Sequence, residues 1–190
     1  YYKNRLIIYF YKKYNNERFK NGEKHYSEFW NNKKIYNIIF NPIIYQINPT
    51  INTIPKYVFQ TYSSIRITNK MKNNIMMLRK NNPEFEFFLY DDQMCRNFIQ
   101  RHFGPNEVYA FDSLIPGAFK ADLWRYCVLY IYGGIYMDIK LQTVNGFKLI
   151  DLIHEECFPV DILNIPACWQ GFLICKPQNP ILKIAIDKIY

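Results

Sequence analysis

The chain has 190 residues, of which 49% are hydrophobic and 18% aromatic, a length and composition typical of one folded domain. Such a composition excludes an intrinsically disordered chain, and no apolar run approaches the roughly 20 residues needed to cross a bilayer. The net charge of +8 is uneven, because residues 1–80 hold 15 Lys and Arg against 3 Asp and Glu, whereas residues 81–190 hold 9 against 13.

A basic half with many Tyr residues could indicate a nucleic-acid partner. The chain is, however, rich in Asn, Ile, Lys and Tyr together. This pattern favours a solvated Lys-rich surface, which also suits an anionic nucleotide-sugar. We therefore expect no nucleic-acid partner.

The five cysteines show no CxxC or other metal-ligand spacing. They lie at positions 95, 127, 157, 168 and 175, several of them in apolar runs. Reduced thiols in a cytosol-like compartment fit this pattern best, so we expect a cytoplasmic protein.

Residues 1–50 alternate short apolar pieces with Lys- and Asn-rich ones, and we expect an N-terminal extension of mixed short elements. Residues 51–190 form the main predicted domain, which we expect to be truncated because the sequence stops within a predicted helix. In the first half of this domain, strands are predicted at 56–61 and 85–90 and helices at 66–80 and 93–103. Asn82-Pro83 is expected to end the first helix and Gly104-Pro105 the second.

The clearest helix is predicted at 119–132, where apolar residues recur at spacings of three and four. Gly133-Gly134 is expected to end it, and strands are predicted at 135–141 and 172–175, with a last helix from about 178. Strands that alternate with helices predict an α/β domain with a mostly parallel sheet.

Asp122, Arg125 and Asp138, three charged residues of this helix and the strand after it, are expected to converge. About ten helical residues separate Asp122 from the helix end, and four strand residues then lead to Asp138. The two antiparallel runs have nearly equal lengths, about 15 and 13 Å, so both carboxylates return to the carboxyl edge of the sheet. Arg125 lies on the same helix face as Asp122. A simple helix ion pair and a turn cap are the structural alternatives for these residues.

The stretches "IPKYVFQTY", "NNPEFEFFLYDD" and "KADLWRYCVLYIYGGIYMDIK" resemble the DXD-containing sugar-binding region of glycosyltransferase family 32. The resemblance covers about residues 54–141 and continues weakly through "GFLICKPQNP". The family includes yeast-type α-mannosyltransferases and is similar in its donor site to the large clostridial glucosylating toxins.

The resemblance implies a GT-A-like fold and a retaining transfer of a hexose from a UDP- or GDP-sugar to a hydroxyl of a glycan or protein acceptor. It implies that Asp122 and Arg125 hold the donor sugar, and that Asp138 bridges ribose and sugar or contacts Mn²⁺ or Mg²⁺. It also implies that Gln60, Thr61 and Tyr62 lie along the nucleotide.

Three positions depart from the family pattern. Phe59 stands where the family often has His, and Tyr62 where it often has Trp. Lys140 replaces the second Asp of the motif, and a protonated Lys offers only hydrogen-bond donors, so it cannot be a metal ligand.

Two hypotheses follow from Lys140. In the first, Asp138 and Lys140 are catalytic, and the Lys140 ammonium neutralises the diphosphate in place of part of the metal. In the second, the metal site is lost and the domain is a non-catalytic nucleotide-sugar-binding relative. A third option is that Lys140 points away from the site, but on a continuous strand Asp138 and Lys140 would share one face. We favour the first hypothesis.

Overall fold

The computed structural model describes residues 35–37, 52–64, 66–115, 117–161 and 167–189. The N-terminal extension predicted for residues 1–50 lies outside the described residues except for β1 (Ile35–Asn37). This strand pairs antiparallel with β3 (Arg66–Thr68) of the following domain. The predicted boundary at residue 50 stays a prediction.

A four-stranded sheet forms the centre of the domain. It consists of β2 (Tyr57–Thr61), β4 (Glu86–Tyr90), β5 (Gly134–Met137) and β6 (Phe172–Cys175), in the order β4-β2-β5-β6. The first three strands are parallel and β6 runs antiparallel to β5. Most of their residues are buried, as expected for strands covered on both faces. The prediction of a mostly parallel α/β sheet is confirmed.

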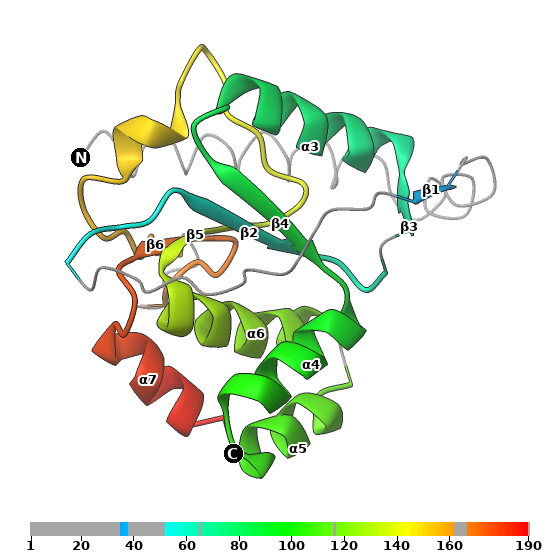
Figure 1. Ribbon diagram of the computed structural model, residues 1–190, viewed down its shortest axis with the longest axis vertical. Coiled ribbons are helices and arrows are strands. Elements are labelled where there is room, and N and C mark those ends of the chain that lie inside the picture. The colour runs from blue at the N-terminus through cyan, green and yellow to red at the C-terminus, as the bar shows by residue number, and fades with distance from the viewer. Residues whose placement is uncertain (1–34, 38–51, 65, 116, 162–166, 190) are drawn as a thin grey trace.

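Helices cover both faces of the sheet (Figure 1). The helical elements are α3 (Asn69–Asn81), α4 (Asp92–His102), α5 (Pro105–Ser113), α6 (Gly117–Tyr132), the 3₁₀ helix η1 (Leu149–Leu152) and α7 (Pro180–Asp187). α4 to α7 lie on one face, and α3 and η1 lie on the other. None of the helices within the described ranges is long and apolar enough to cross a membrane.

Two helical regions differ from the sequence prediction. The helix expected from Arg66 begins only at Asn69, because residues 66–68 pair with β1 and the Thr68 side chain then caps α3. Gly104-Pro105 ends α4 as predicted, but it also starts α5, which the sequence analysis missed. Pro105 occupies the first helical turn, and the Glu107 carboxylate accepts from the backbone N–H of Gly104 at 3.0 Å.

The reversal after α6 depends on Gly133, which has a φ of +65° and whose N–H donates to the Leu129 carbonyl at 2.8 Å. A Cβ at this position would lie 2.6 Å from the backbone nitrogen of Pro177. The predicted Gly-Gly reversal is therefore confirmed. The strand that follows is shorter than predicted, since β5 ends at Met137 instead of Leu141.

Candidate active site

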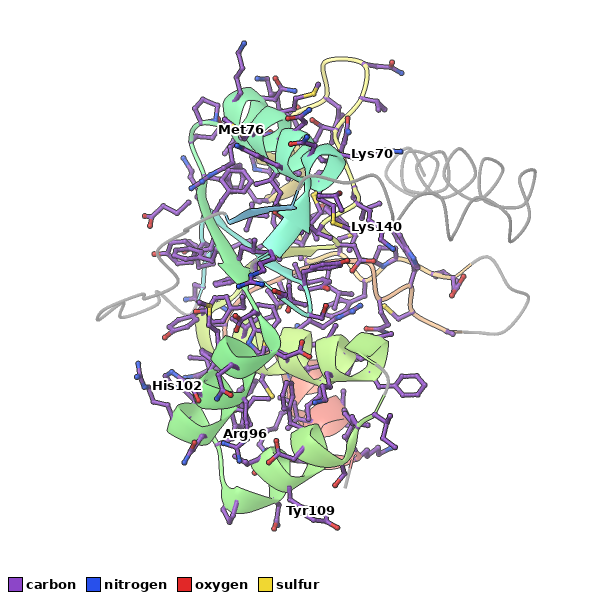
Figure 2. All side chains as sticks on the ribbon, turned by 90° about the vertical axis from the view of Figure 1, so that its right-hand side faces the viewer. Lys70, Met76, Arg96, His102, Tyr109 and Lys140 are labelled. Atoms are coloured by element: carbon purple, nitrogen blue, oxygen red, sulfur yellow. The ribbon has the colours of Figure 1, made fainter. Side chains whose placement is uncertain are left out.

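The candidate site lies at the carboxyl edge of the three parallel strands. The arrowheads of β2 and β4 point to the right in Figure 1, and Figure 2 looks onto this side of the molecule. Because β6 is antiparallel, the residues that precede it reach the same edge, and α6, which runs against β5, brings its first half there. Open α/β sheets bind ligands at such an edge.

Arg125 lies between the two predicted carboxylates. Its Nη2 atom is 3.1 Å from Asp122 Oδ1 and 4.0 Å from Asp138 Oδ1, and its side chain is only 5% exposed. Its Nε donates to the Ala121 carbonyl at 3.1 Å and Nη1 donates to the Gln170 carbonyl. The simple helix ion pair is therefore not the whole arrangement, because Arg125 joins α6 to β5 and to the segment before β6.

Tyr136 contacts both Arg125 and Asp138 and holds them in place. Its ring is buried on β5, with the Arg125 guanidinium carbon 4.3 Å from the ring centroid. Its hydroxyl donates to Asp138 Oδ1 at 2.9 Å. The Asp138 N–H donates to the Gly171 carbonyl at 2.9 Å, which continues the sheet by one bond. Asp138 is thus held in one orientation by its own strand and by its neighbour.

Both carboxylates remain partly accessible, since the Asp122 and Asp138 side chains are 33% and 45% exposed. Partial burial raises the pKa of Asp138 above its usual range, although Arg125, the Tyr136 hydroxyl and the Lys140 charge each act to lower it. Burial likewise raises the pKa of Asp122, against the effect of Arg125. Two accessible carboxylates on a fixed guanidinium can accept hydrogen bonds from several hydroxyl groups of one ligand.

Lys140 does not lie on a strand, so the inference of a shared strand face was wrong. The chain turns after Asp138, and the Leu141 N–H donates to the Asp138 carbonyl at 2.9 Å. The buried Asn74 amide from α3 donates to the carbonyls of Ile139 and Leu141, both at 2.8 Å, and so ties this turn to α3. Lys140 is consequently an exposed residue of a turn at the carboxyl edge, on the side shown in Figure 2.

The three residues predicted along the nucleotide differ in accessibility. Gln60 is 1% exposed, and its Nε2 has no hydrogen-bond partner among the described residues. The Thr61 hydroxyl donates to the Tyr90 carbonyl at 2.9 Å. Tyr62 is half-buried and packs on the cluster around Ile67 and Ile139 on the α3 side. A nucleotide at this edge would therefore meet Tyr62 and Thr61 before Gln60, and the roles of all three stay predictions.

Two further residues near the site have structural roles. Phe59, which stands where the family often has His, is fully buried and stacks on Phe88 with ring centroids 5.3 Å apart. The side chain of Asp91 accepts from the Met94 N–H at 2.8 Å and caps α4. The departure at Phe59 thus lies in the core and leaves the surface of the site unchanged.

The residues present do not fit a DXD metal site. Among the residues that the structure describes, no group of three or more His, Cys, Asp or Glu side chains could hold a metal ion. Asp138 Oδ1 already accepts from Tyr136 and faces Arg125. The second motif position, Lys140, supplies a positive charge instead of the hard oxygen ligand that Mn²⁺ or Mg²⁺ needs. The family implies a divalent metal, but this donor set gives no support for one.

The sequence analysis missed three contributors to the site. Tyr136 and the Gln170 carbonyl hold Arg125, and Gly171 allows close packing, because a Cβ there would lie 2.6 Å from the Trp169 ring and 3.2 Å from Asp138 Oδ2. A glycine directly before a predicted strand was the available signal for the last of these. The other two are contacts across the fold, for which the sequence has no local pattern.

This architecture, a mostly parallel sheet flanked by helices on both faces, is GT-A-like. The chain is similar in fold to a solved structure of PaToxG glycosyltransferase, with a TM-score of 0.53 at 15% sequence identity, covering 73% of this chain and 61% of that one. Residues 68–158 match the family described as the glycosyltransferase sugar-binding region containing the DXD motif.

The chain is also similar to curated proteins that are named as glycosyltransferases. The chain is 35% identical over 139 residues to inositol phosphoceramide mannosyltransferase 2 of Schizosaccharomyces pombe, covering 72% of this chain and 38% of the relative. It is 30% identical over 91 residues to mannosyl phosphorylinositol ceramide synthase SUR1 of Saccharomyces cerevisiae, covering 48% of this chain and 24% of that protein. An uncharacterized glycosyltransferase, L373, of Acanthamoeba polyphaga mimivirus is 32% identical over 47% of this chain and 35% of its own length. The chain thus spans about a quarter to two fifths of the length of these relatives.

Proposed function

We propose that this chain is the donor-binding domain of a glycosyltransferase that moves a hexose from a nucleotide-diphospho-sugar to a hydroxyl acceptor, with retention of configuration. The supporting observation is the arrangement of Asp122, Arg125 and Asp138 at the carboxyl edge, with Nη2 of one guanidinium 3.1 and 4.0 Å from the two carboxylates. The names of the relatives favour mannose as the hexose and a glycan or glycolipid as the acceptor.

Each member of this cluster has a distinct role in the proposal. The accessible Asp122 and Asp138 carboxylates accept hydrogen bonds from hydroxyl groups of the sugar and, at Asp138, of the ribose. Arg125 is nearly inaccessible, so it acts as a positioning residue that orients the two carboxylates. Lys140 lies on the exposed turn that follows Asp138.

Donor hydrolysis and thermal shift test this proposal together. Ligands that bind the folded state raise the melting temperature, so GDP-mannose, UDP-glucose and UDP-galactose are each mixed with the chain and the shift is recorded. We expect a shift with one donor and release of its sugar. Asp138→Asn should abolish the release, and the NMR signal of the first-formed anomer should show retention. No shift with any of the donors would contradict the proposal.

The alternative is a nucleotide-sugar-binding relative without transfer activity. Lys140, in the place that the resemblance gives to a metal-binding Asp, is the observation that favours it. Tight donor binding with no hydrolysis and no transfer to any hydroxyl acceptor would support this alternative.

The cysteines are the observation that bears on the cellular compartment. All five cysteines are free thiols, which is compatible with the expected reducing, cytoplasmic environment. The cytoplasmic placement nevertheless stays a prediction.

The expectation that the chain has no nucleic-acid partner is tested by adding single-stranded RNA at low salt, where a basic nucleic-acid-binding domain would bind.

A further inference from the structure

The turn that follows Asp138 presents a lysine at a fixed place beside the candidate site. Asn74 holds the carbonyls on both sides of Lys140, and Ile139 is buried against Ile67, Ile75 and Leu89. The backbone of the turn is therefore anchored, while the Lys140 side chain itself stays exposed. Because the backbone is already held, only the Lys140 side chain has to be ordered when its ammonium meets an anion.

The charges around this position leave no net negative charge for a divalent metal, because two cationic side chains balance two carboxylates. Arg125 lies 3.1 Å from Asp122 and 4.0 Å from Asp138 and offsets part of their negative charge. Lys140, two residues after Asp138 in the sequence, adds a second positive charge. A divalent metal at this place would lie among two cationic side chains and would gain one carboxylate that already accepts from Tyr136.

We propose that the Lys140 ammonium binds the diphosphate of the donor directly, so that this domain binds a nucleoside diphosphate without a divalent metal. The inference rests on the proposed function and deepens it, because it assigns the diphosphate subsite and removes the metal requirement. An ammonium offers three donors and one full positive charge, and both match the non-bridging oxygens of a diphosphate.

The test measures binding of GDP and of UDP by isothermal titration calorimetry, once in EDTA and once in Mn²⁺. The wild-type chain should bind one of them in EDTA, and Mn²⁺ should change the affinity by less than about threefold. Lys140→Met should weaken binding about 10- to 100-fold in both buffers, since a hydrogen bond to a charged group is lost. The matched control is Lys80→Met, on the exposed last turn of α3, which should bind like the wild type.

A second variant distinguishes a binding role of Lys140 from a merely structural one. Lys140→Asp restores the second carboxylate of the motif, and it should bind poorly in EDTA but recover at least tenfold in Mn²⁺. Because position 140 is exposed, both variants should keep the wild-type circular dichroism spectrum and melting temperature within a few degrees.

The outcomes separate this inference from the proposed function. Nucleotide binding by the wild type in Mn²⁺ only, or wild-type affinity of Lys140→Met in EDTA, would overturn the role of Lys140 and leave the donor-binding function standing. Binding of neither nucleotide in either buffer would overturn both.

Discussion

At the residue scale, the site combines groups that face solvent with groups that do not. Asp122 and Asp138 retain accessible oxygens, whereas Arg125 and Tyr136 are buried and satisfied inside the protein. A buried guanidinium contributes to stability mainly through what its removal leaves behind, which is two facing carboxylates without a cation. The candidate site and the stability of the sheet edge therefore depend on the same side chain.

Replacing Arg125 by Met should lower the free energy of unfolding by about 1–3 kcal/mol, because two partly exposed carboxylates lose the cation between them and two backbone carbonyls lose their donor. Arg125→Lys keeps the charge but loses the planar fork that reaches Ala121, Gln170 and Asp122 at once, so an intermediate loss is expected. Urea denaturation measures both. The control Arg66→Met, at an exposed position on β3, should stay within about 0.5 kcal/mol of the wild type. Equal stability of Arg125→Met and this control would refute the buried-partner explanation.

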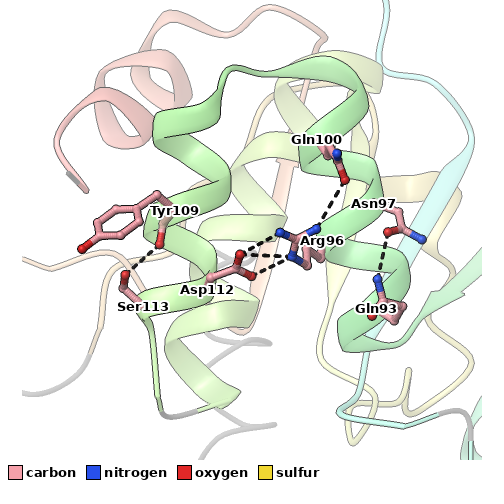
Figure 3. Close-up of polar contacts among 7 residues, drawn as sticks. All are labelled: Gln93, Arg96, Asn97, Gln100, Tyr109, Asp112 and Ser113. Atoms are coloured by element: carbon pink, nitrogen blue, oxygen red, sulfur yellow. Dashed lines mark hydrogen bonds and ion pairs between the residues drawn. The ribbon is translucent and has the colours of Figure 1, made fainter.

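At the element scale, the helical face below the sheet is joined by polar contacts as well as by the core. Arg96 on α4 and Asp112 on α5 form a bidentate pair, with Nε 2.8 Å from Oδ1 and Nη2 2.8 Å from Oδ2 (Figure 3). Arg96 also reaches Gln100 on its own helix at 3.3 Å. The pair holds α5, the helix that the sequence analysis missed, against its neighbour.

The Arg96 hydrogen bonds hold the pKa of Asp112 below its usual range. A carboxylate whose folded-state pKa is depressed stabilises the fold above its unfolded pKa of about 3.9, and this stabilisation is lost as the pH falls through the folded value. Asp112→Asn should therefore melt lower than the wild type at pH 7, by at most a few degrees because the pair is exposed. The difference should shrink as the pH falls below about 4.

Melting curves of both proteins between pH 7 and pH 2.5 measure this effect. Glu84→Gln, which neutralises an exposed carboxylate in the turn before β4, is the matched control and should show no such convergence. A gap between Asp112→Asn and the wild type that stays constant with pH would argue against the ion pair as its cause.

Two glycines allow the cost of a left-handed backbone conformation to be measured apart from the cost of a steric clash. Gly133 has a φ of +65° and a built Cβ would clash with Pro177, whereas Gly146 has a φ of +73° and nothing lies within 4 Å of its built Cβ. Gly146→Ala should cost about 1–2 kcal/mol, the strain of a left-handed residue alone. Gly133→Ala should cost clearly more, because the rigid Pro177 backbone must also move. Chemical denaturation measures the difference, and equal costs would show that the turn at Pro177 adapts freely.

At the scale of the whole molecule, the order of strands and helices from β2 to α7 was predictable, apart from β3, α5 and η1. Hydrophobic runs, Pro and Gly mark these elements locally, and the glycine pair with the apolar stripe of α6 fixed the reversal that brings Asp138 back to Asp122. The end of β5 was not predictable in this way. It depends on the Asn74 amide, which reaches from α3 across 65 residues of sequence to capture two carbonyls.

The residues of the candidate site also divide into those that sequence spacing predicts and those that depend on contacts across the fold. Asp122, Arg125 and Asp138 follow from spacing, because a helix and a strand of nearly equal length return to one end. Tyr136 and the Gln170 carbonyl come from packing between segments, and the burial of Gln60 depends on which strands flank β2. Sequence patterns indicate which residues arrive at an edge, and the contacts across the sheet decide which of them remain accessible.

We expect the sheet and the helical layer formed by α4 to α7 to unfold as one unit. Three buried cysteines on different elements allow this expectation to be measured. Cys95 on α4, Cys127 on α6 and Cys175 on β6 lie in one hydrophobic cluster, and burial raises the pKa of each thiol. Because the thiolate is the reactive form, each should be alkylated only when the cluster opens, and all three at one common rate. Cys168 is half-buried, with a pKa raised to about 11, and should react earlier, as should the half-buried Cys157. Pulsed alkylation with peptide mass spectrometry reads out each position, and labelling of Cys175 before Cys95 and Cys127 would show that β6 detaches from the sheet on its own.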